Sequence, residues 1–145
     1  MTRARIVRVQ IKLVADVALT AADRVAFVRY ADTSKYDGER GWFLPDDYLA
    51  HGEHPDDAAR RIAREQVGLD ADVRLAEIES FANGAWHLIF HYVAAVAEAA
   101  PLARGPNVAA AEWHARDALP PAEDVAHHGW ALEVLERVLP AQAAA

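Results

Sequence analysis

Residues 41–69 read GWFLPDDYLAHGEHPDDAARRIAREQVGL, and this stretch decides the fold. It begins with an aromatic-Leu-Pro turn, continues through an acidic loop with a Gly-Glu pair, and ends in a segment with helical spacing. Pro55 suits the first position of a helix, and the two aspartates after it complement the helix dipole. Gly68 is a typical C-terminal stop. We therefore expect a loop–helix–loop whose helix runs from Pro55 to about Val67.

The segments around this stretch alternate apolar and polar side chains with the period of strands. Near the N-terminus, for example, valines and leucines alternate with Arg8, Gln10 and Lys12. We expect strands at residues 6–19, 24–30, 42–44, 73–81, 86–96 and 110–115, a turn at 82–84, and a last helix over 120–139. This order of strands, one helix, more strands and a final helix predicts an α+β fold, in which helices pack on a mixed sheet.

Length and composition limit the possible function classes. At 145 residues the chain is expected to form one domain, residues 1–140, with an alanine-rich disordered tail at 141–145. The formal net charge of -7 argues against nucleic acid polymers and anionic membranes as partners. Without cysteine there is no thiolate nucleophile and no cysteine-based zinc site. No apolar run is long enough for a signal peptide or a membrane span, so we expect a cytoplasmic protein.

The stretch 41–69 resembles the signature of the Nudix family of pyrophosphohydrolases. That signature is G-x5-E-x7-R-E-U-x-E-E-x-G-U, where U is a bulky aliphatic residue, and a Leu-Pro-Gly-Gly turn usually introduces it. The chain matches it at Leu44, Pro45, Glu53, Arg61, Glu65, Gly68 and Leu69, whereas Asp46 and Asp47 replace the glycines and Ile62 and Gln66 replace glutamates. The resemblance covers nearly the whole chain. It implies the Nudix fold, an α/β/α sandwich with the loop–helix–loop and a C-terminal helix packed on a mixed sheet.

The resemblance also implies where the chemistry would lie. Hydrolysis of a diphosphate needs divalent cations and a base, and in the family glutamates at positions 62, 65 and 66 hold the cations with help from the backbone carbonyl of the first glycine. Here Ile62 cannot ligate, and Gln66 offers only a neutral amide oxygen. The resemblance implies Glu53, Arg61 and Glu65 as catalytic-site residues, Glu65 and Glu112 as metal ligands, and Mg²⁺ or Mn²⁺ as the cofactor. Glu65 alternatively reads as an exposed helical glutamate paired with Arg61.

Five further residues are candidates for ligand binding: Asp46, Asp47, His51, His87 and His91. The two aspartates either supply carboxylates in place of the glycines or are ordinary turn residues. His87 and His91 share one face of a strand, because their spacing is even. Together with His51 they would bind a softer metal such as Zn²⁺ or Mn²⁺, or act as acid and base. The alternative is that they are ordinary hydrogen-bonded or solvated histidines.

These observations predict a Nudix-like protein that binds a small nucleotide-like or phosphorylated ligand without the standard pyrophosphohydrolase activity. The alternative is a divergent, metal-dependent Nudix hydrolase of a nucleoside diphosphate derivative. In both cases the partner is a small molecule, and the resemblance adds a homodimer to the expectations. Whether the protein is an enzyme stays open at this point, because the spacing of the motif is kept while two of its glutamates are replaced.

Overall fold

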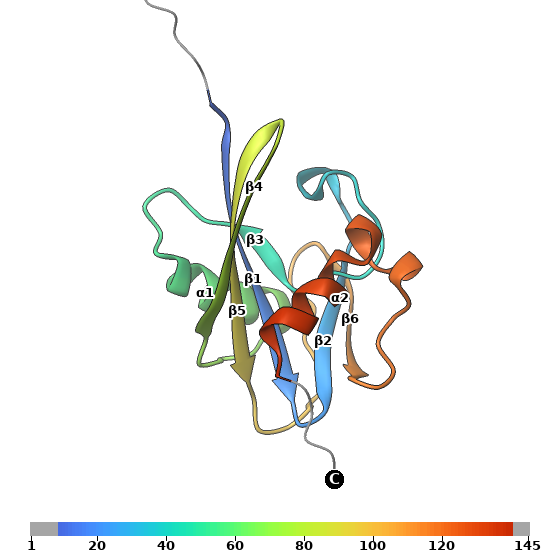
Figure 1. Ribbon diagram of the computed structural model, residues 1–145. Coiled ribbons are helices and arrows are strands. Elements are labelled where there is room, and N and C mark those ends of the chain that lie inside the picture. Colours follow the sequence, from blue (N-terminus) through green and yellow to red (C-terminus); the bar gives the residue numbers. More distant parts are fainter. Residues whose placement is uncertain (1–8, 141–145) are drawn as a thin grey trace, which may run out of the picture.

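A mixed six-stranded sheet forms the centre of the computed structural model, which describes residues 9–140 (Figure 1). Its strands are β1 (Ile11–Ala21), β2 (Arg24–Tyr30), β3 (Asp46–Tyr48), β4 (Arg74–Asn83), β5 (Ala85–Ala95) and β6 (Val108–Ala115). The strand order is β4-β5-β1-β2-β6, and β3 pairs with β1 outside this path. The long pairing of β1 with β5 is parallel, whereas the other pairings are antiparallel. The sheet is therefore mixed, as the sequence predicts.

Two helices cover opposite faces of this sheet (Figure 1). Helix α1 (Pro55–Val67) packs its apolar stripe, which includes Ile62, into one core with β1 and β2, while α2 (Ala126–Val138) packs into a second core with Phe27 and Trp42. Two short 3-10 helices, η1 (Ser34–Tyr36) and η2 (Ala122–Asp124), lie in the connections before β3 and α2. This arrangement confirms the α+β class and the α/β/α layering.

Helix α1 begins and ends where the sequence predicts. Pro55 is its first residue, and the His54 side chain caps the N-terminus by accepting a hydrogen bond from the Asp56 N–H at 3.0 Å. At the other end Gly68 adopts a left-handed conformation with φ of 73°, and its N–H donates to the Arg64 carbonyl at 3.1 Å. Only glycine adopts this conformation at little cost, which explains why the helix stops there.

The predicted short strand at residues 42–44 does not form as such. Trp42 and Phe43 make only single bridges, to Val125 and Val28 respectively. The strand of this region is instead β3, which begins directly after Pro45 and pairs with β1. These aromatic residues are buried in the two cores, so packing rather than a ladder of hydrogen bonds holds the segment. The predicted turn at 82–84 is also shorter than expected, because only Gly84, with φ of 72°, separates β4 from β5.

The last helix also begins later than predicted. The segment expected to open it forms η2 instead, and His127, His128 and Gly129 at the start of α2 have left-handed backbone angles. Regular helix therefore begins only after Gly129. The predicted start of the first strand at residues 6–8 and the predicted tail at 141–145 lie outside the described residues. Within residues 9–140, no helix is long and apolar enough to cross a membrane.

Candidate functional site

Arg61 ties the acidic loop to helix α1. Its Nε and Nη2 donate to the two carboxylate oxygens of Glu53 at 2.9 and 3.0 Å, and Nη2 also donates to the Tyr48 carbonyl at 2.9 Å. Its Nη1 reaches Asp47 at 3.3 Å, and Glu53 accepts a further bond from the Ala50 N–H at 2.9 Å. The hydrogen bonds from Arg61 lower the pKa of Glu53. Glu53 and Arg61 thus brace the loop–helix–loop.

The position expected to carry a metal-binding glutamate, Gln66, makes internal hydrogen bonds instead. Its Nε2 donates to the Asp46 carbonyl at 2.7 Å, and its Oε1 accepts from the Tyr30 hydroxyl at 2.8 Å. The Tyr30 hydroxyl also lies 3.2 Å from the Asp46 carbonyl, and Tyr36 approaches it at 3.3 Å. Asp46 is the first of the two residues that replace the turn glycines. The backbone carbonyl that the family would offer to a cation is therefore occupied by protein donors.

The remaining metal positions do not fit a Mg²⁺ site either. The Ile62 side chain is 1% exposed and belongs to the apolar core beneath α1. The Glu65 side chain is 57% exposed, and Arg61 at 3.6 Å is its ion-pair partner. Glu112 lies on β6 beside His114, at 3.5 Å from its Nε2. A hard cation needs several oxygen ligands around one point, and the residues at positions 62, 65 and 66 do not supply them.

A buried charge cluster lies on the α2 face of the sheet. His91, which is fully buried, has its Nδ1 at 2.8 and 2.9 Å from the Asp16 carboxylate oxygens and its Nε2 at 2.8 Å from Glu79. Arg137 of α2 donates to Glu79 at 2.8 Å and to Glu77 at 3.0 Å. Burial alone would lower the pKa of His91, but the hydrogen bonds and charges of Asp16 and Glu79 outweigh it and raise that pKa.

Within residues 9–140, Glu77, Glu79 and His91 are the acidic and histidine side chains whose donor atoms gather closely enough to share a cation. Both ring nitrogens of His91 already face carboxylates, and Arg137 already supplies positive charge to the glutamates. The hydrogen-bonding and charged groups of the cluster therefore already have partners within the protein. Among the described residues, His51, His87 and His91 do not gather closely enough to share a cation.

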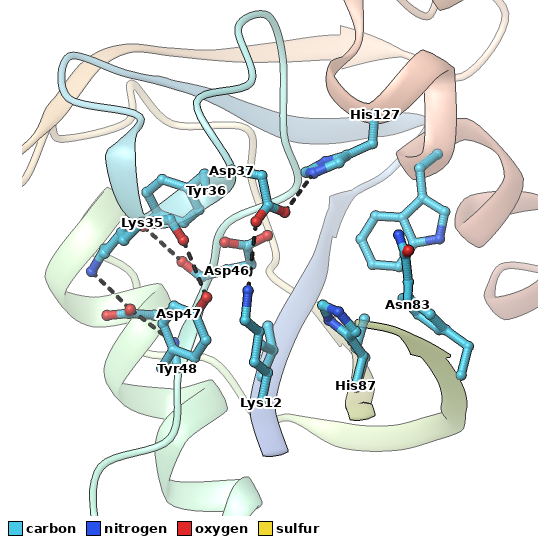
Figure 2. A pocket seen from close by; sticks show the side chains of 14 residues that line it. Lys12, Lys35, Tyr36, Asp37, Asp46, Asp47, Tyr48, Asn83, His87 and His127 are labelled. Atoms are coloured by element: carbon cyan, nitrogen blue, oxygen red, sulfur yellow. Dashed lines mark hydrogen bonds and ion pairs between the residues drawn. The ribbon is translucent and has the colours of Figure 1, made fainter. Parts of the chain in front are cut away.

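A cavity of about 210 Å³ opens beside the turn that contains Pro45, on the same α2 face (Figure 2). We refer to it as the turn cavity. Cross-strand pairing of Val14 with Tyr48 and of Asp16 with Asp46 places the side chains of Asp46 and Tyr48 on this face. Aromatic side chains from four elements line the turn cavity: Tyr36 of η1, Tyr48 of β3, Phe81 of β4 and Trp130 of α2. Such a lining suits a planar organic group.

Most charged side chains of the turn cavity are paired with one another. Lys12 lies 3.7 Å from Asp37, whose other oxygen is 3.1 Å from the Nε2 of His127 (Figure 2). Lys35 contacts Asp47 at 2.8 Å. Burial raises the pKa of Asp37, but the hydrogen bond from His127 and the charge of Lys12 outweigh it, so that this pKa is lowered. These charged side chains of the cavity wall are thus already engaged in ion pairs.

Asp46 is the exception among these side chains. It is 9% exposed, and within the described chain neither of its carboxyl oxygens has a hydrogen-bond or ion-pair partner, since its bonds run through the backbone. Burial raises its pKa well above the ordinary value, and the nearby charges of Asp16 and Asp47 raise it further. Asp46 therefore holds a proton far more readily than an exposed aspartate does.

Of the five ligand-binding candidates from the sequence, Asp46, Asp47 and His87 line the turn cavity. His87 stacks on Phe81 with ring centroids 4.7 Å apart. His91 shares the strand face with His87, as its spacing predicts, but lies in the buried cluster. Sequence reasoning missed the partners Asp16 and Glu79. The one available signal was a charged residue at position 16 inside an otherwise apolar segment.

The geometry of the turn, the helix and the sheet agrees with a comparison of the sequence with known families. The sequence profile of the NUDIX domain matches residues 11–135. The chain belongs to the NUDIX domain family. No curated protein sequence matches this NUDIX domain closely enough to add a relative.

Solved structures support the same assignment. This NUDIX domain is similar to a MutT NUDIX hydrolase from Burkholderia pseudomallei, with a TM-score of 0.71 and 19% identity over 89% of this chain and 98% of that one. It is similar to the NUDIX domain of Shewanella oneidensis NrtR complexed with ADP ribose, with a TM-score of 0.67 and 14% identity over 90% and 87%. It spans 47% of a MutT/nudix family protein from Enterococcus faecalis, with a TM-score of 0.63 and 16% identity over 79% of this chain. At these identities the likeness concerns the fold alone.

Proposed function

We propose that this NUDIX domain binds a small nucleotide-like or phosphorylated ligand in the turn cavity and does not carry out metal-dependent pyrophosphate hydrolysis. The observation that carries the proposal is the hydrogen bond from Gln66 to the Asp46 carbonyl. A cation at this carbonyl would have to displace the amide and the Tyr30 hydroxyl. Nothing in the surrounding side chains compensates for that loss, because Ile62 is apolar and buried.

Two observations support ligand binding. The turn cavity lies beside the motif turn, and its aromatic side chains suit the flat organic group of a nucleotide-like ligand. In addition, the NUDIX domain of NrtR, which shares this fold, was solved as a complex with ADP ribose. A NUDIX domain can therefore be expected to hold a ligand of this size. Self-association, which the family resemblance predicts, stays a prediction that light scattering on the purified chain would test.

The experiment is a calorimetric titration with ADP ribose and other nucleoside diphosphate compounds, with and without Mg²⁺, followed by product analysis. We expect at least one compound to bind with an affinity that Mg²⁺ does not change, and no product. Phe81→Ala removes an aromatic wall and should weaken binding about threefold to tenfold. Ile78→Ala is the matched control, because Ile78 lies on the same strand, is 50% exposed and does not line the cavity. Equal affinity for both variants would contradict the proposal.

A divergent metal-dependent hydrolase is the second candidate function, and one observation favours it. Three carboxylates surround Arg61: Glu53 at 2.9 Å, Asp47 at 3.3 Å and Glu65 at 3.6 Å. The same titrations decide between the two functions. Product formation that requires Mg²⁺ or Mn²⁺ and is lost in Glu65→Gln would establish the hydrolase and remove the first proposal.

A further inference from the structure

The carboxyl group of Asp46 faces the turn cavity without an internal partner. The backbone N–H and carbonyl of this residue are bonded to Tyr30 and Gln66, so its backbone is held firmly in place. The side chain lines both the turn cavity and a smaller cavity of about 10 Å³ behind it. Its carboxyl oxygens have no protein partner in the described chain and border the open cavity, where a ligand can reach them. A carboxyl group in this position is therefore suited to a contact with a ligand.

The structure around Asp46 determines which carboxyl group carries a proton. Asp46 is the direct cross-strand partner of Asp16, and both line the smaller cavity, so two acidic groups lie opposite each other. Both ring nitrogens of His91 face carboxyl groups, those of Asp16 and Glu79, and a doubly protonated ring donates a hydrogen bond to each. The His91 imidazolium favours the ionised form of Asp16, although burial outweighs it and leaves the pKa of Asp16 raised. Asp46 has no ion-pair partner in the described chain, and the charge of Lys35 does not offset its burial, so Asp46 is the member that holds the proton.

A protonated carboxyl group has a specific recognition pattern. It presents a donor, the O–H, and an acceptor, the C=O, side by side in one plane. The complementary group is a flat edge that carries an acceptor and a donor on adjacent atoms. A ring nitrogen next to an amino group has this pattern, and so does a ring N–H next to a carbonyl.

The dimensions and lining of the turn cavity fit such a ring. Its volume of about 210 Å³ is below the roughly 300–1,000 Å³ typical of sites for drug-sized ligands, so it encloses one ring system rather than a whole nucleotide. Asp46 and Lys12 stand between Tyr36 and Tyr48 on one side and His87 on the other (Figure 2). Phosphate groups are disfavoured inside, because Asp37 and Asp47 line the cavity and its lysines are already paired with them.

We propose that Asp46 recognises the edge of a nitrogen heterocycle that carries a hydrogen-bond donor and an acceptor on adjacent atoms. The ring enters the turn cavity, and any phosphate groups of the ligand stay outside it. This inference rests on the proposed function, because it names the part of the ligand that the cavity encloses.

The test uses two pairs of isomeric probes. The compounds 2-aminopyridine and 2-pyridone carry the adjacent donor and acceptor, whereas 3-aminopyridine and 3-hydroxypyridine have the same atoms without that edge. Each is titrated into the unmodified chain at neutral pH, and binding is followed by heteronuclear NMR. We expect the first member of each pair to bind at least about tenfold more tightly, since its isomer leaves the carboxyl group of Asp46 unpaired. This comparison needs no variant, so a folding defect cannot obscure it.

Two substitutions of Asp46 sharpen the result. Asp46→Asn keeps a donor and an acceptor side by side, so the preference between isomers should persist within about threefold. Asp46→Leu has a similar shape but no polar edge, and the isomers should then bind alike. Asp37→Asn is the matched control, because Asp37 is a cavity carboxylate whose oxygens are already paired with Lys12 and His127. It should leave the preference unchanged. Thermal unfolding checks that each variant is folded.

Three results would overturn the inference: equal binding of the isomers to the unmodified chain, a preference that survives in Asp46→Leu, or a preference abolished in Asp46→Asn. The last would mean that Asp46 acts as an anion toward a cation. The two proposals fail separately. If ADP ribose binds while the isomers bind alike, the proposed function stands and this inference is wrong. If the isomer preference appears while no phosphorylated compound binds, the role of Asp46 stands and the proposed ligand class is wrong.

Discussion

At the scale of single residues, two side chains of helix α1 hold the preceding loop. Arg61 is a residue of the family signature, and Gln66 replaces a glutamate of that signature. Arg61 binds Glu53 through two of its nitrogens, and Gln66 binds the turn through the Asp46 carbonyl. Both side chains join the helix to the same acidic turn. Hydrogen bonds within the chain from both side chains therefore stabilise the loop–helix–loop.

Replacing Gln66 tests the internal bonds of this turn. Gln66→Leu keeps the volume but leaves the Tyr30 hydroxyl and the Asp46 carbonyl short of a partner in a buried place. We expect a loss of about 1–3 kcal/mol in the free energy of unfolding, measured by urea denaturation. Glu65→Leu is the control, because the Glu65 side chain is 57% exposed, and it should change stability by less than about 0.5 kcal/mol. Equal changes in unfolding free energy for the two variants would show that the hydrogen bonds of Gln66 do not stabilise the fold.

Replacing Arg61 by lysine tests the geometry of the clamp rather than its charge. Lysine keeps the positive charge but cannot bond both oxygens of Glu53 and the Tyr48 carbonyl at once. We expect Arg61→Lys to lower the unfolding free energy by about 1–2 kcal/mol. Arg60→Lys on the same helix serves as the control, because Arg60 is 49% exposed and contacts Asp57 through one nitrogen. A cost for Arg60→Lys as large as for Arg61→Lys would contradict this explanation.

The sequence predicts the role of some of these residues and not of others, for a physical reason. Glu53 and Arg61 are separated by a fixed spacing within one loop–helix unit, so local pattern is enough to pair them. Gln66 meets Tyr30, and Asp16 meets His91, across strands that are distant in sequence. Those contacts depend on strand order and register, which one sequence does not determine. The turn cavity depends on the same register.

At the scale of elements, the helix with standard caps was predictable and the helix without them was not. Helix α1 has a proline at its start and a glycine after its end, and its bounds are confirmed. Helix α2 has no side-chain cap, and its first turn is left-handed at three residues. Close packing explains this start, because a Cβ at Gly129 would lie 2.9 Å from the Cβ of Ala122. Such packing against η2 leaves no signal in the local pattern.

The left-handed start of α2 leads to a stabilising substitution. His128 has φ of 57° and an exposed side chain, and a residue with a Cβ loses roughly 1–2 kcal/mol in this conformation. His128→Gly should therefore raise the unfolding free energy by up to about 1 kcal/mol, once the greater freedom of glycine in the unfolded chain is subtracted. Ala126→Gly, at a position without positive φ, should instead destabilise by about 0.5–1 kcal/mol. Thermal unfolding of both variants measures the difference, and destabilisation by His128→Gly would refute it.

At the scale of the whole molecule, the cluster around His91 joins the sheet to α2. Asp16 belongs to β1, His91 to β5 and Glu79 to β4, while Arg137 reaches them from α2. The α2 layer is thus attached by charged groups as well as by apolar packing. Asp46 pairs across the strands with Asp16 of this cluster, so the proposed recognition of a ligand would depend on groups that also hold the layer.

Removing His91 should be costly for the whole fold. His91→Leu leaves the carboxylates of Asp16 and Glu79 without the cation between them. We expect a loss of about 3–5 kcal/mol, the usual result of removing one partner of a buried ion pair. The double variant Asp16→Asn, His91→Gln leaves a neutral hydrogen-bonding pair, while Glu79 keeps its contact with Arg137. It should be more stable than His91→Leu in urea denaturation, and the reverse order would exclude an electrostatic cause.

The pH dependence of stability follows from the same cluster. Because the pKa of His91 is raised above 6.5 in the folded chain, the folded chain binds more protons than the unfolded chain at pH values above 6.5. Stability should therefore fall as pH rises from 6.5 through the raised pKa of His91. Asp16 and Asp46, whose pKa values are raised from 3.8, act in the same direction. The pKa of His114 is lowered from 6.5 by burial, so this residue makes stability rise with pH, and it does so only at pH values below about 6.5.

Urea denaturation of the unmodified chain at a series of pH values above neutrality would measure this decline. The double variant Asp16→Asn, His91→Gln removes the coupled pair and should show a shallower decline. His51→Gln is the control, since His51 is exposed in a loop outside the cluster, and it should keep the full slope. A flat profile in the unmodified chain, or the same slope in the double variant, would mean that His91 does not carry its proton in the folded protein. The argument for a protonated Asp46 opposite an ionised Asp16 would then lose its counter-charge.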